Sequence, residues 1–267
     1  MRSKYANIGG VAVNYFHTGP STLPGTVPAL DQGALLLFLH GAGSNAHTWH
    51  RQVEHFGRAH SAVAVDFPGH GRSGSTEGLG GIEVYAYFTA AFVEALRLRP
   101  AVVGGRGMGG AVAVAFAFAH PQRVRALILV GTPARFEIPA DSLDTWHNVT
   151  RGRAPQPFSP DLFSPKTEFG IMREVWTEQV QTDPRVRYFD LMGCRDVDLT
   201  ARAARISVPT LVISGRDDRF ATPERAEALQ RAIAGAQLVI VEDAGHALTS
   251  EQPGRFNEAV AGFLAAL

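Results

Sequence analysis

Apolar residues along the chain gather into short continuous runs, and most of these runs end in glycine or a polar residue. The runs occupy residues 34–39, 61–65, 101–104, 125–131, 209–214 and 237–241. A short apolar run without alternation is typical of a strand buried on both faces of a parallel sheet. The N-terminal sequence differs, because residues 5–8 and 11–16 flank Gly9-Gly10 and predict a hairpin. Residues 17–33 are rich in Gly, Pro, Ser and Thr and predict a loop.

Helical segments separate these runs. Residues 83–98 have the periodicity of an amphipathic helix. Its predicted buried face contains Val84, Phe88, Ala91, Phe92 and Ala95. An alanine-rich helix is predicted from Met108, and two more begin at Pro223 and Pro253, since proline suits a first helical position. Alternation of strands and helices over this length is most simply explained by one α/β domain.

Residues 134–205 break this alternation. The stretch 151–160 contains too many prolines for regular structure, and aromatic residues recur in the helical segments around it. An apolar lid over a pocket would use such residues, and so would a small core belonging to the segment itself. Phe136 and Trp146 are the candidates for pocket lining.

Composition narrows the function classes. With 267 residues, of which 45% are hydrophobic, the chain can bury a full core. A formal net charge of zero favours neither nucleic acid nor an anionic membrane surface as partner. The single Cys194 excludes an intramolecular disulfide and fits a reducing compartment. No apolar signal core or membrane-length run is present, so we expect a soluble cytoplasmic protein.

The most informative stretch is Gly105-Arg-Gly-Met-Gly109, which joins an apolar strand to the alanine-rich helix. Strand, tight turn and helix are the context of the nucleophile elbow G-x-S-x-G. Glycines flank the nucleophile in this motif because strand and helix nearly touch there. The serine position is held by Gly107, which has no side chain and therefore cannot attack a substrate.

A dinucleotide-binding turn is the alternative for the same stretch. Gly105, Gly107 and Gly110 satisfy the pattern G-x-G-x-x-G, which is weak evidence by itself. That fingerprint also requires an acidic ribose ligand about 20 residues further on. The next strand, residues 127–130, instead ends in Gly131-Thr-Pro. The sequence therefore favours the elbow.

A second glycine-rich turn, His40-Gly-Ala-Gly43, follows the first central strand. Such a turn can direct a backbone N–H at a developing oxyanion. In the elbow geometry the N–H groups of Ala42 and Met108 would form the pair of donors. An ordinary strand-to-helix turn is the alternative. Gly41 and Trp49 are further candidates for the substrate pocket.

Carboxylates and histidines follow other predicted strands. Asp218 comes after the strand 209–214, and His246 comes after the last strand. A general base needs an imidazole whose second nitrogen donates to a buried carboxylate, so we expect His246 to be oriented by Asp218 rather than by the neighbouring Asp217. Asp66 and His70 lie in a glycine-rich turn, where we expect a buried structural network instead of catalysis.

These motifs together resemble the α/β-hydrolase superfamily over nearly the whole chain. The ending Glu251-Gln-Pro253 with Phe256-Asn257 is similar to the branch of single-domain esterases, enol-lactonases and cofactor-free haloperoxidase-like proteins. The resemblance implies a mostly parallel sheet flanked by helices. It also implies a core at 1–133 and 206–267, with a small helical cap at 134–205. The implied chemistry is hydrolysis of an ester-type bond in a small-molecule substrate through an acyl-enzyme, with no cofactor and no metal.

Gly107 departs from the family pattern and leaves two hypotheses open. In the first, an engineered change from serine to glycine, made to trap a ligand, inactivates an esterase or lactonase whose other catalytic groups are intact. In the second, glycine is native, and the pocket serves a lyase or hydratase reaction with His246 as base, or ligand binding alone. Haloalkane dehalogenases of this fold have aspartate at the elbow, which Gly107 also excludes. The intact Asp218 and His246 favour the first hypothesis; no motif specifies the substrate or the oligomeric state.

Overall fold

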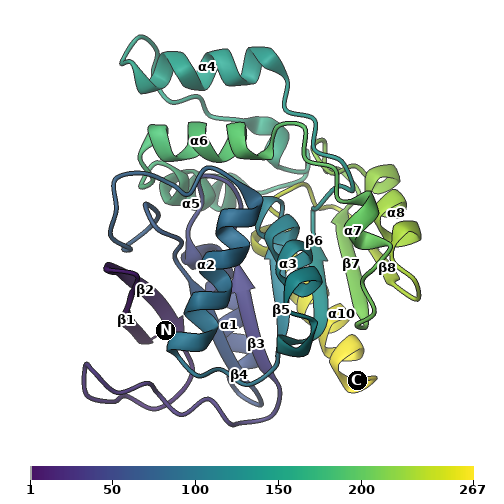
Figure 1. The fold of residues 1–267 in the computed structure, drawn as a ribbon. Coiled ribbons are helices and arrows are strands. Elements are labelled where there is room, and N and C mark those ends of the chain that lie inside the picture. The colour runs from purple at the N-terminus through teal and green to yellow at the C-terminus, as the bar shows by residue number, and fades with distance from the viewer. Residues whose placement is uncertain (1) are drawn as a thin grey trace.

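The computed structural model describes residues 2–267, and its centre is one eight-stranded sheet (Figure 1). The strands are β1 (Arg2–Ile8), β2 (Val11–His17), β3 (Leu35–Leu39), β4 (Ser61–Val65), β5 (Ala101–Arg106), β6 (Val124–Val130), β7 (Thr210–Gly215) and β8 (Gln237–Val241). They lie in the order β1-β2-β4-β3-β5-β6-β7-β8. β1 and β2 form the predicted hairpin, β2 pairs antiparallel with β4, and every pair from β4 to β8 is parallel. The predicted α/β fold with a mostly parallel sheet is confirmed.

Helices cover both faces of the sheet. They are α1 (His50–Phe56), α2 (Ile82–Ala95), α3 (Met108–Ala119), α4 (Ala140–Thr150), α5 (Phe169–Gln179), α6 (Pro184–Cys194), α7 (Thr200–Ala203), α8 (Pro223–Ala232), α9 (Leu248–Glu251) and α10 (Pro253–Ala265). Short 3₁₀ turns lie at Ala46–Trp49 (η1), Pro121–Arg123 (η2) and Pro160–Leu162 (η3). None of the helices within residues 2–267 combines the length and apolarity needed to cross a bilayer.

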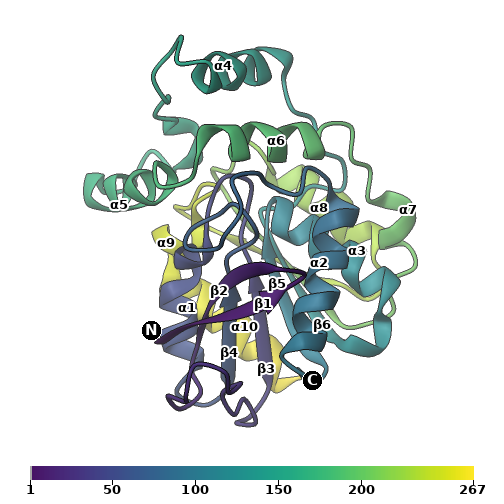
Figure 2. The same cartoon turned by 60° about the vertical axis from the view of Figure 1, so that its left-hand side comes forward.

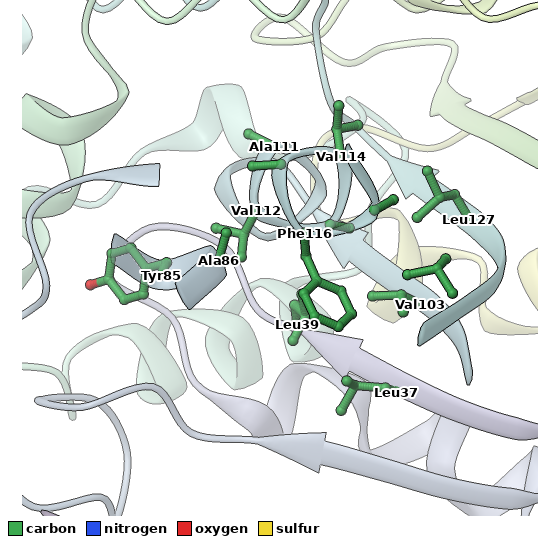
Figure 3. Packing of buried hydrophobic residues seen from close by; sticks show 14 of the residues in the cluster. Leu37, Leu39, Tyr85, Ala86, Val103, Ala111, Val112, Val114, Phe116 and Leu127 are labelled. Carbon is green, nitrogen blue, oxygen red and sulfur yellow. The ribbon is translucent and has the colours of Figure 1, made fainter. Parts of the chain in front are cut away.

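Two hydrophobic cores lie on opposite faces of the sheet, because successive side chains of a strand point in opposite directions. On one face, Leu37 and Leu39 of β3 belong to the same cluster as buried residues of α2 and α3, among them Phe116 (Figure 3). On the other face, Leu36 and Phe38 belong to the cluster that includes α1 and α10. Since β3 is buried throughout, its continuous apolar run is explained.

The amphipathic helix α2 is rotated from the predicted face. Val84 was expected to be buried, but 49% of it is exposed, and Ala95 is also exposed. Phe88 and Phe92 face the core as predicted, together with Tyr85. The Tyr85 hydroxyl donates a hydrogen bond of 2.5 Å to Asp190 of α6. This distant partner gives Tyr85 a place in the interior that local periodicity does not reveal.

The segment 134–205 contributes helices to two places. Figures 1 and 2 both show α4, α5 and α6 stacked above the sheet. The short α7 instead contacts α3 and α8, and its Ala203 is buried in the core beside the sheet. The helices above the sheet therefore come from the part of the segment that precedes α7. They cover the strand ends where the candidate site lies.

Candidate active site

A pocket of about 720 Å³ lies between the strand ends and the helices above them. Seven of the residues predicted for the site line it: Gly41, Ala42, Gly107, Met108, Phe136, Trp146 and His246. Pockets at the carboxyl ends of parallel strands are the usual ligand sites of open α/β sheets. Chain segments far apart in sequence therefore meet in one cavity.

Trp49 is not part of this pocket, so its assignment as a pocket residue is wrong. It is fully buried on η1, where its ring stacks on Phe38 at a centroid distance of 4.7 Å and tilts against Phe256 of α10. The turn after β3 passes the pocket before η1 begins, and η1 then directs Trp49 into the core. The large apolar ring of Trp49 therefore serves packing of the core.

Gly107 occupies the sharp turn between β5 and α3, with φ 52° and ψ −115°. The flanking positions admit no side chain. A Cβ on Gly105 would lie 2.2 Å from the carbonyl oxygen of Gly109, and a Cβ on Gly109 would lie 2.3 Å from that of Leu39. Strand and helix thus approach as the elbow motif requires. The backbone of the motif is present in full.

The space beside Gly107 is directed toward His246. A Cβ built at Gly107 would have His246 Nε2 as its nearest neighbour, at 3.5 Å, and no contact closer than that. A hydroxyl on such a carbon would be within hydrogen-bonding reach of the imidazole. The site therefore has room for a Cβ at residue 107, directed toward His246.

Asp218 and His246 form a hydrogen-bonded pair, with 2.9 Å between Oδ2 and Nδ1. The other carboxylate oxygen of Asp218 accepts backbone hydrogen bonds from Phe220 at 2.8 Å and Ala221 at 2.9 Å. Burial acts to raise the pKa of Asp218, but His246 and these backbone donors lower it below its usual range. Gly131 leaves room for the pair, since a Cβ there would lie 3.1 Å from both partner atoms. Asp218 therefore carries its negative charge beneath the imidazole.

Two backbone N–H groups, of Ala42 in the turn after β3 and of Met108 at the start of α3, belong to residues that line the pocket. They donate to no other residue within 2–267, whereas the adjacent Gly43 N–H donates to Asp190 Oδ2 at 2.9 Å. Both donors are therefore without a partner in the described part of the protein.

Asp190 is a buried carboxylate near the pocket that sequence reasoning missed. This carboxylate of α6 is 1% exposed and joins the segment above the sheet to the turn after β3. It accepts a second bond from Tyr85 and forms a 2.8 Å ion pair with His70 Nε2. Burial disfavours the charged imidazole, but Asp190 raises the pKa of His70 above its ordinary value. No local pattern distinguished Asp190 from any other helix carboxylate.

Asp66 and His70 belong to a buried network, as the sequence predicted. Asp66 accepts backbone hydrogen bonds from Ala46 at 2.7 Å and Arg72 at 2.9 Å, and it is 1% exposed. It therefore fixes the turn after β4 against η1. Neither residue is among those that line the pocket.

Sequence reasoning also missed several charged groups that lie between the sheet and the helices above it. Arg106 and Arg187 both line the pocket. Glu178 of α5 is 7% exposed and accepts a 2.8 Å hydrogen bond from the Ser44 hydroxyl. Burial raises the pKa of Glu178 to about 7, although Arg106 and Ser44 oppose that shift. Within residues 2–267, no group of three His, Cys, Asp or Glu side chains is placed to hold a metal ion.

Stability should depend on pH through Glu178. Because its pKa is about 7 in the folded protein and about 4.5 when exposed, the folded state holds a proton that the unfolded state releases between these values. The free energy of unfolding should therefore fall as pH rises from about 4.5 to 7, by up to about 3 kcal/mol from this group. We expect Glu178→Gln to flatten the curve measured by urea unfolding across this range.

Glu174→Gln, on the same helix, is the matched control. Glu174 pairs with Arg51, and this hydrogen bond lowers the pKa of Glu174. Its contribution is present above its unfolded pKa and is lost as pH falls, so the substitution should leave the fall between pH 5 and 7 in place. A Glu178→Gln curve as steep as that of the unsubstituted protein would contradict the assignment.

The elbow backbone should also affect stability. Side chains rarely adopt the backbone angles of Gly107, and such strain costs about 1–3 kcal/mol. We expect Gly107→Ala to lower the melting temperature, by roughly 2–4 °C for each kcal/mol. Gly262→Ala on α10 is the control, because a Cβ there meets nothing within 4 Å and the backbone is helical. Gly262→Ala should raise the free energy of unfolding by about 0.5–1 kcal/mol. An equal gain for Gly107→Ala would contradict the prediction that a side chain at residue 107 is strained.

Comparison with known proteins identifies the family. Residues 36–259 match the sequence model described as "Alpha/beta hydrolase family". The 2-hydroxy-6-oxononadienedioate/2-hydroxy-6-oxononatrienedioate hydrolase of Burkholderia vietnamiensis is 31% identical over 255 residues, covering 86% of this chain and 86% of that protein.

Solved structures agree. The enol-lactonase of Burkholderia xenovorans superimposes with a TM-score of 0.81 at 27% identity, covering 98% of this chain and 99% of that one. A thermophilic esterase of Thermogutta terrifontis has a TM-score of 0.84 at 24% identity, covering 100% and 99%, and supports the fold alone. With the sheet order, the elbow backbone and the Asp218–His246 pair, these matches show that the chain belongs to the alpha/beta hydrolase family and is an α/β-fold hydrolase.

Proposed function

We propose that the pocket is built to hydrolyse a carboxylic ester or lactone of a small molecule, in a chain whose nucleophile position is held by Gly107. The observation that carries this proposal is the direction of the open space at Gly107. It leads from the elbow backbone to Nε2 of His246, whose Nδ1 is bound by Asp218. The enol-lactonase among the structural relatives supports the same class of substrate.

The proposed chemistry follows from these positions once a hydroxyl is present at residue 107. His246 Nε2 takes the hydroxyl proton while the oxygen attacks the acyl carbon, and Asp218 stabilises the imidazolium that forms. The Ala42 and Met108 N–H groups stabilise the negative charge that develops on the carbonyl oxygen. His246 then returns the proton to the departing alkoxide, and water releases the acid from the acyl-enzyme by the same steps.

With glycine at residue 107 no acyl-enzyme can form. What remains are the two amide donors, the His246 base and the pocket itself. Such groups alone accelerate hydrolysis by only about 10³–10⁴-fold over water in serine hydrolases that lack their nucleophile. The chain as it stands is therefore expected to bind its substrate and turn it over very slowly.

The test is covalent labelling. Gly107→Ser protein treated with a fluorophosphonate should gain one adduct at residue 107, located by peptide mass spectrometry. Gly107→Ala has a similar backbone constraint without the hydroxyl and should gain none. A correctly folded Gly107→Ser protein that stays unlabelled would refute the proposal, because the hydroxyl would then not be activated by His246.

A second function is favoured by one observation: the His246–Asp218 pair is intact although no nucleophile precedes it. A base of this kind would serve a lyase or hydratase reaction on a small molecule bound at the Ala42 and Met108 amides. Turnover that His246→Ala abolishes and Gly107→Ser leaves unchanged would support this function over ester hydrolysis. A chain that only binds its ligand would retain affinity in both variants.

A further inference from the structure

Two arginine side chains face the pocket without a carboxylate partner. Arg106 precedes the elbow glycine at the end of β5, and Arg187 projects from α6. Within residues 2–267 neither forms an ion pair. Each has one long side-chain hydrogen bond, from Arg106 Nη2 to Ser44 at 3.4 Å and from Arg187 Nη1 to Gln179 at 3.4 Å. Two guanidinium groups with so few partners have donors left for a ligand.

Both arginines lie against the turn that supplies the Ala42 amide. A Cβ on Gly41 would come within 3.8 Å of Arg106 Nε, and a Cβ on Gly43 would come within 2.5 Å of Arg187 Nε. The two side chains therefore flank the same three-residue turn. A group bound between them would be close to the acyl carbonyl of a substrate that occupies the amide donors.

Arg106 is held in a position that costs free energy when it has no anion. It is 5% exposed, and its Nε has no hydrogen-bond partner among the described residues. Burial lowers its pKa, and burial together with Arg106 lowers the pKa of Arg187 to about 10. The Arg187 guanidinium also lies 4.7 Å from the centre of the Trp146 ring. An unpaired guanidinium buried in this way is stabilised by any carboxylate that reaches it.

Carboxylates act on the two arginines from a distance but contact neither. Glu178, which is bound to Ser44, acts on both; Asp218 and Glu251 also act on Arg106, and Asp190 acts on Arg187. The arginines at the rim differ, because Arg219 pairs with Asp161 and Arg225 pairs with Glu137, and all four side chains are exposed. Of the arginines that line the pocket, the two in the interior are therefore the ones without an ion pair within residues 2–267.

We propose that Arg106, together with Arg187, binds a carboxylate on the acyl part of the substrate, so that the pocket selects monoesters or lactones of dicarboxylic acids over neutral esters. Guanidinium groups suit this partner because their planar array of donors matches two carboxylate oxygens. The selection rests on the proposed function for its acyl chemistry, but the binding itself requires no nucleophile.

The test uses the protein with Gly107, in which the substrate is held without an acyl-enzyme. Isothermal titration calorimetry would compare monoethyl esters of malonate, succinate, glutarate and adipate with the corresponding diethyl esters. Hydrogen bonds to charged groups lead us to expect that at least one monoester binds about 10–100-fold more tightly than its diester. Equal affinities throughout the series would overturn the proposal.

Substitutions of the two arginines test whether they cause the preference for monoesters. Arg106→Met and Arg187→Met should each reduce monoester affinity about 10-fold or more while leaving the affinity for the diester unchanged. Arg225→Met removes a rim arginine and should alter neither. If the arginine variants lose both ligands equally, their role is structural and the proposal fails. Should Arg106→Met not fold, Arg106→Lys keeps the charge without the planar donors and should show a reduced preference.

Failure here is distinguishable from failure of the proposed function. Fluorophosphonate labelling of Gly107→Ser reports the nucleophile and base with a neutral reagent, so it does not depend on the arginines. If the serine is labelled but no monoester is preferred over its diester, the proposed hydrolase function stands and the proposed carboxylate-binding site is refuted. If monoesters are preferred but the serine is not labelled, the carboxylate-binding site stands and the proposed acyl-enzyme mechanism is refuted.

Discussion

Gly107→Ser is expected to raise kcat/KM toward short p-nitrophenyl esters and lactones by about 10³-fold or more over the unsubstituted protein. The gain has a structural reason. A Cβ at residue 107 meets no atom closer than His246 Nε2 at 3.5 Å, so the first carbon of the serine side chain enters without a clash. His246 and Asp218 are already hydrogen-bonded to each other. Under the proposed function, with the Ala42 and Met108 amides as donors, the hydroxyl is the one catalytic group that the chain lacks.

The new activity should be accompanied by lower stability. Serine at φ 52° is strained, as alanine would be, so the active variant should melt below the unsubstituted protein. Initial rates with p-nitrophenyl acetate and butyrate measure the gain, and Gly107→Ala controls for the added Cβ. Equal rates for the serine and alanine variants, both folded by circular dichroism, would contradict the prediction.

The second large effect concerns Asp218. In the Gly107→Ser protein, Asp218→Asn should lower kcat by about 10⁴-fold. Asp218 accepts a hydrogen bond from Nδ1 of His246 at 2.9 Å, which leaves Nε2 free to take a proton. An asparagine can present its NH₂ to Nδ1 and stabilise the opposite tautomer, in which Nε2 already carries its proton. His246→Ala should reduce kcat by at least as much.

Asp217→Asn provides the control for charge removal in the same loop. Asp217 accepts a 2.5 Å hydrogen bond from the Ser164 hydroxyl and is not a partner of His246. We expect its substitution to change kcat by less than about 10-fold, because only the packing of the segment before α5 is affected. Comparable losses at 217 and 218 would mean that the loop as a whole, rather than the pair, supports activity.

Much of the fold was predictable because its signals are local. Runs such as 34–39 and 61–65 read as buried strands, and they are β3 and β4 of the parallel sheet. The glycines around residue 107 predicted a close approach of strand and helix, and the structure shows this approach. Asp218 and His246 were found from their place after strands, since parallel strands end at one edge of the sheet and bring such residues together.

Predictions from local sequence were wrong where a residue distant in the chain determines which way a side chain points. Val84 and Trp49 were placed by periodicity and by nearness to a glycine turn. The structure exposes the first and buries the second against Phe38 and Phe256. Periodicity identifies a helix better than the direction of its buried face, because two adjacent stripes can satisfy it equally.

The class of the sheet, the elbow backbone, the missing side chain at Gly107 and the order of Asp218 and His246 could all be inferred from the amino-acid sequence. Which charged groups lie in or beside the pocket became visible in the folded protein. Arg106, Glu178, Arg187 and Asp190 look like ordinary surface residues in the sequence. Several of their partners come from segments more than 60 residues away, such as Ser44 for Arg106 and Gly43 for Asp190. Because desolvation and hydrogen bonding set the effect of a charge, its role depends on neighbours that only folding brings together.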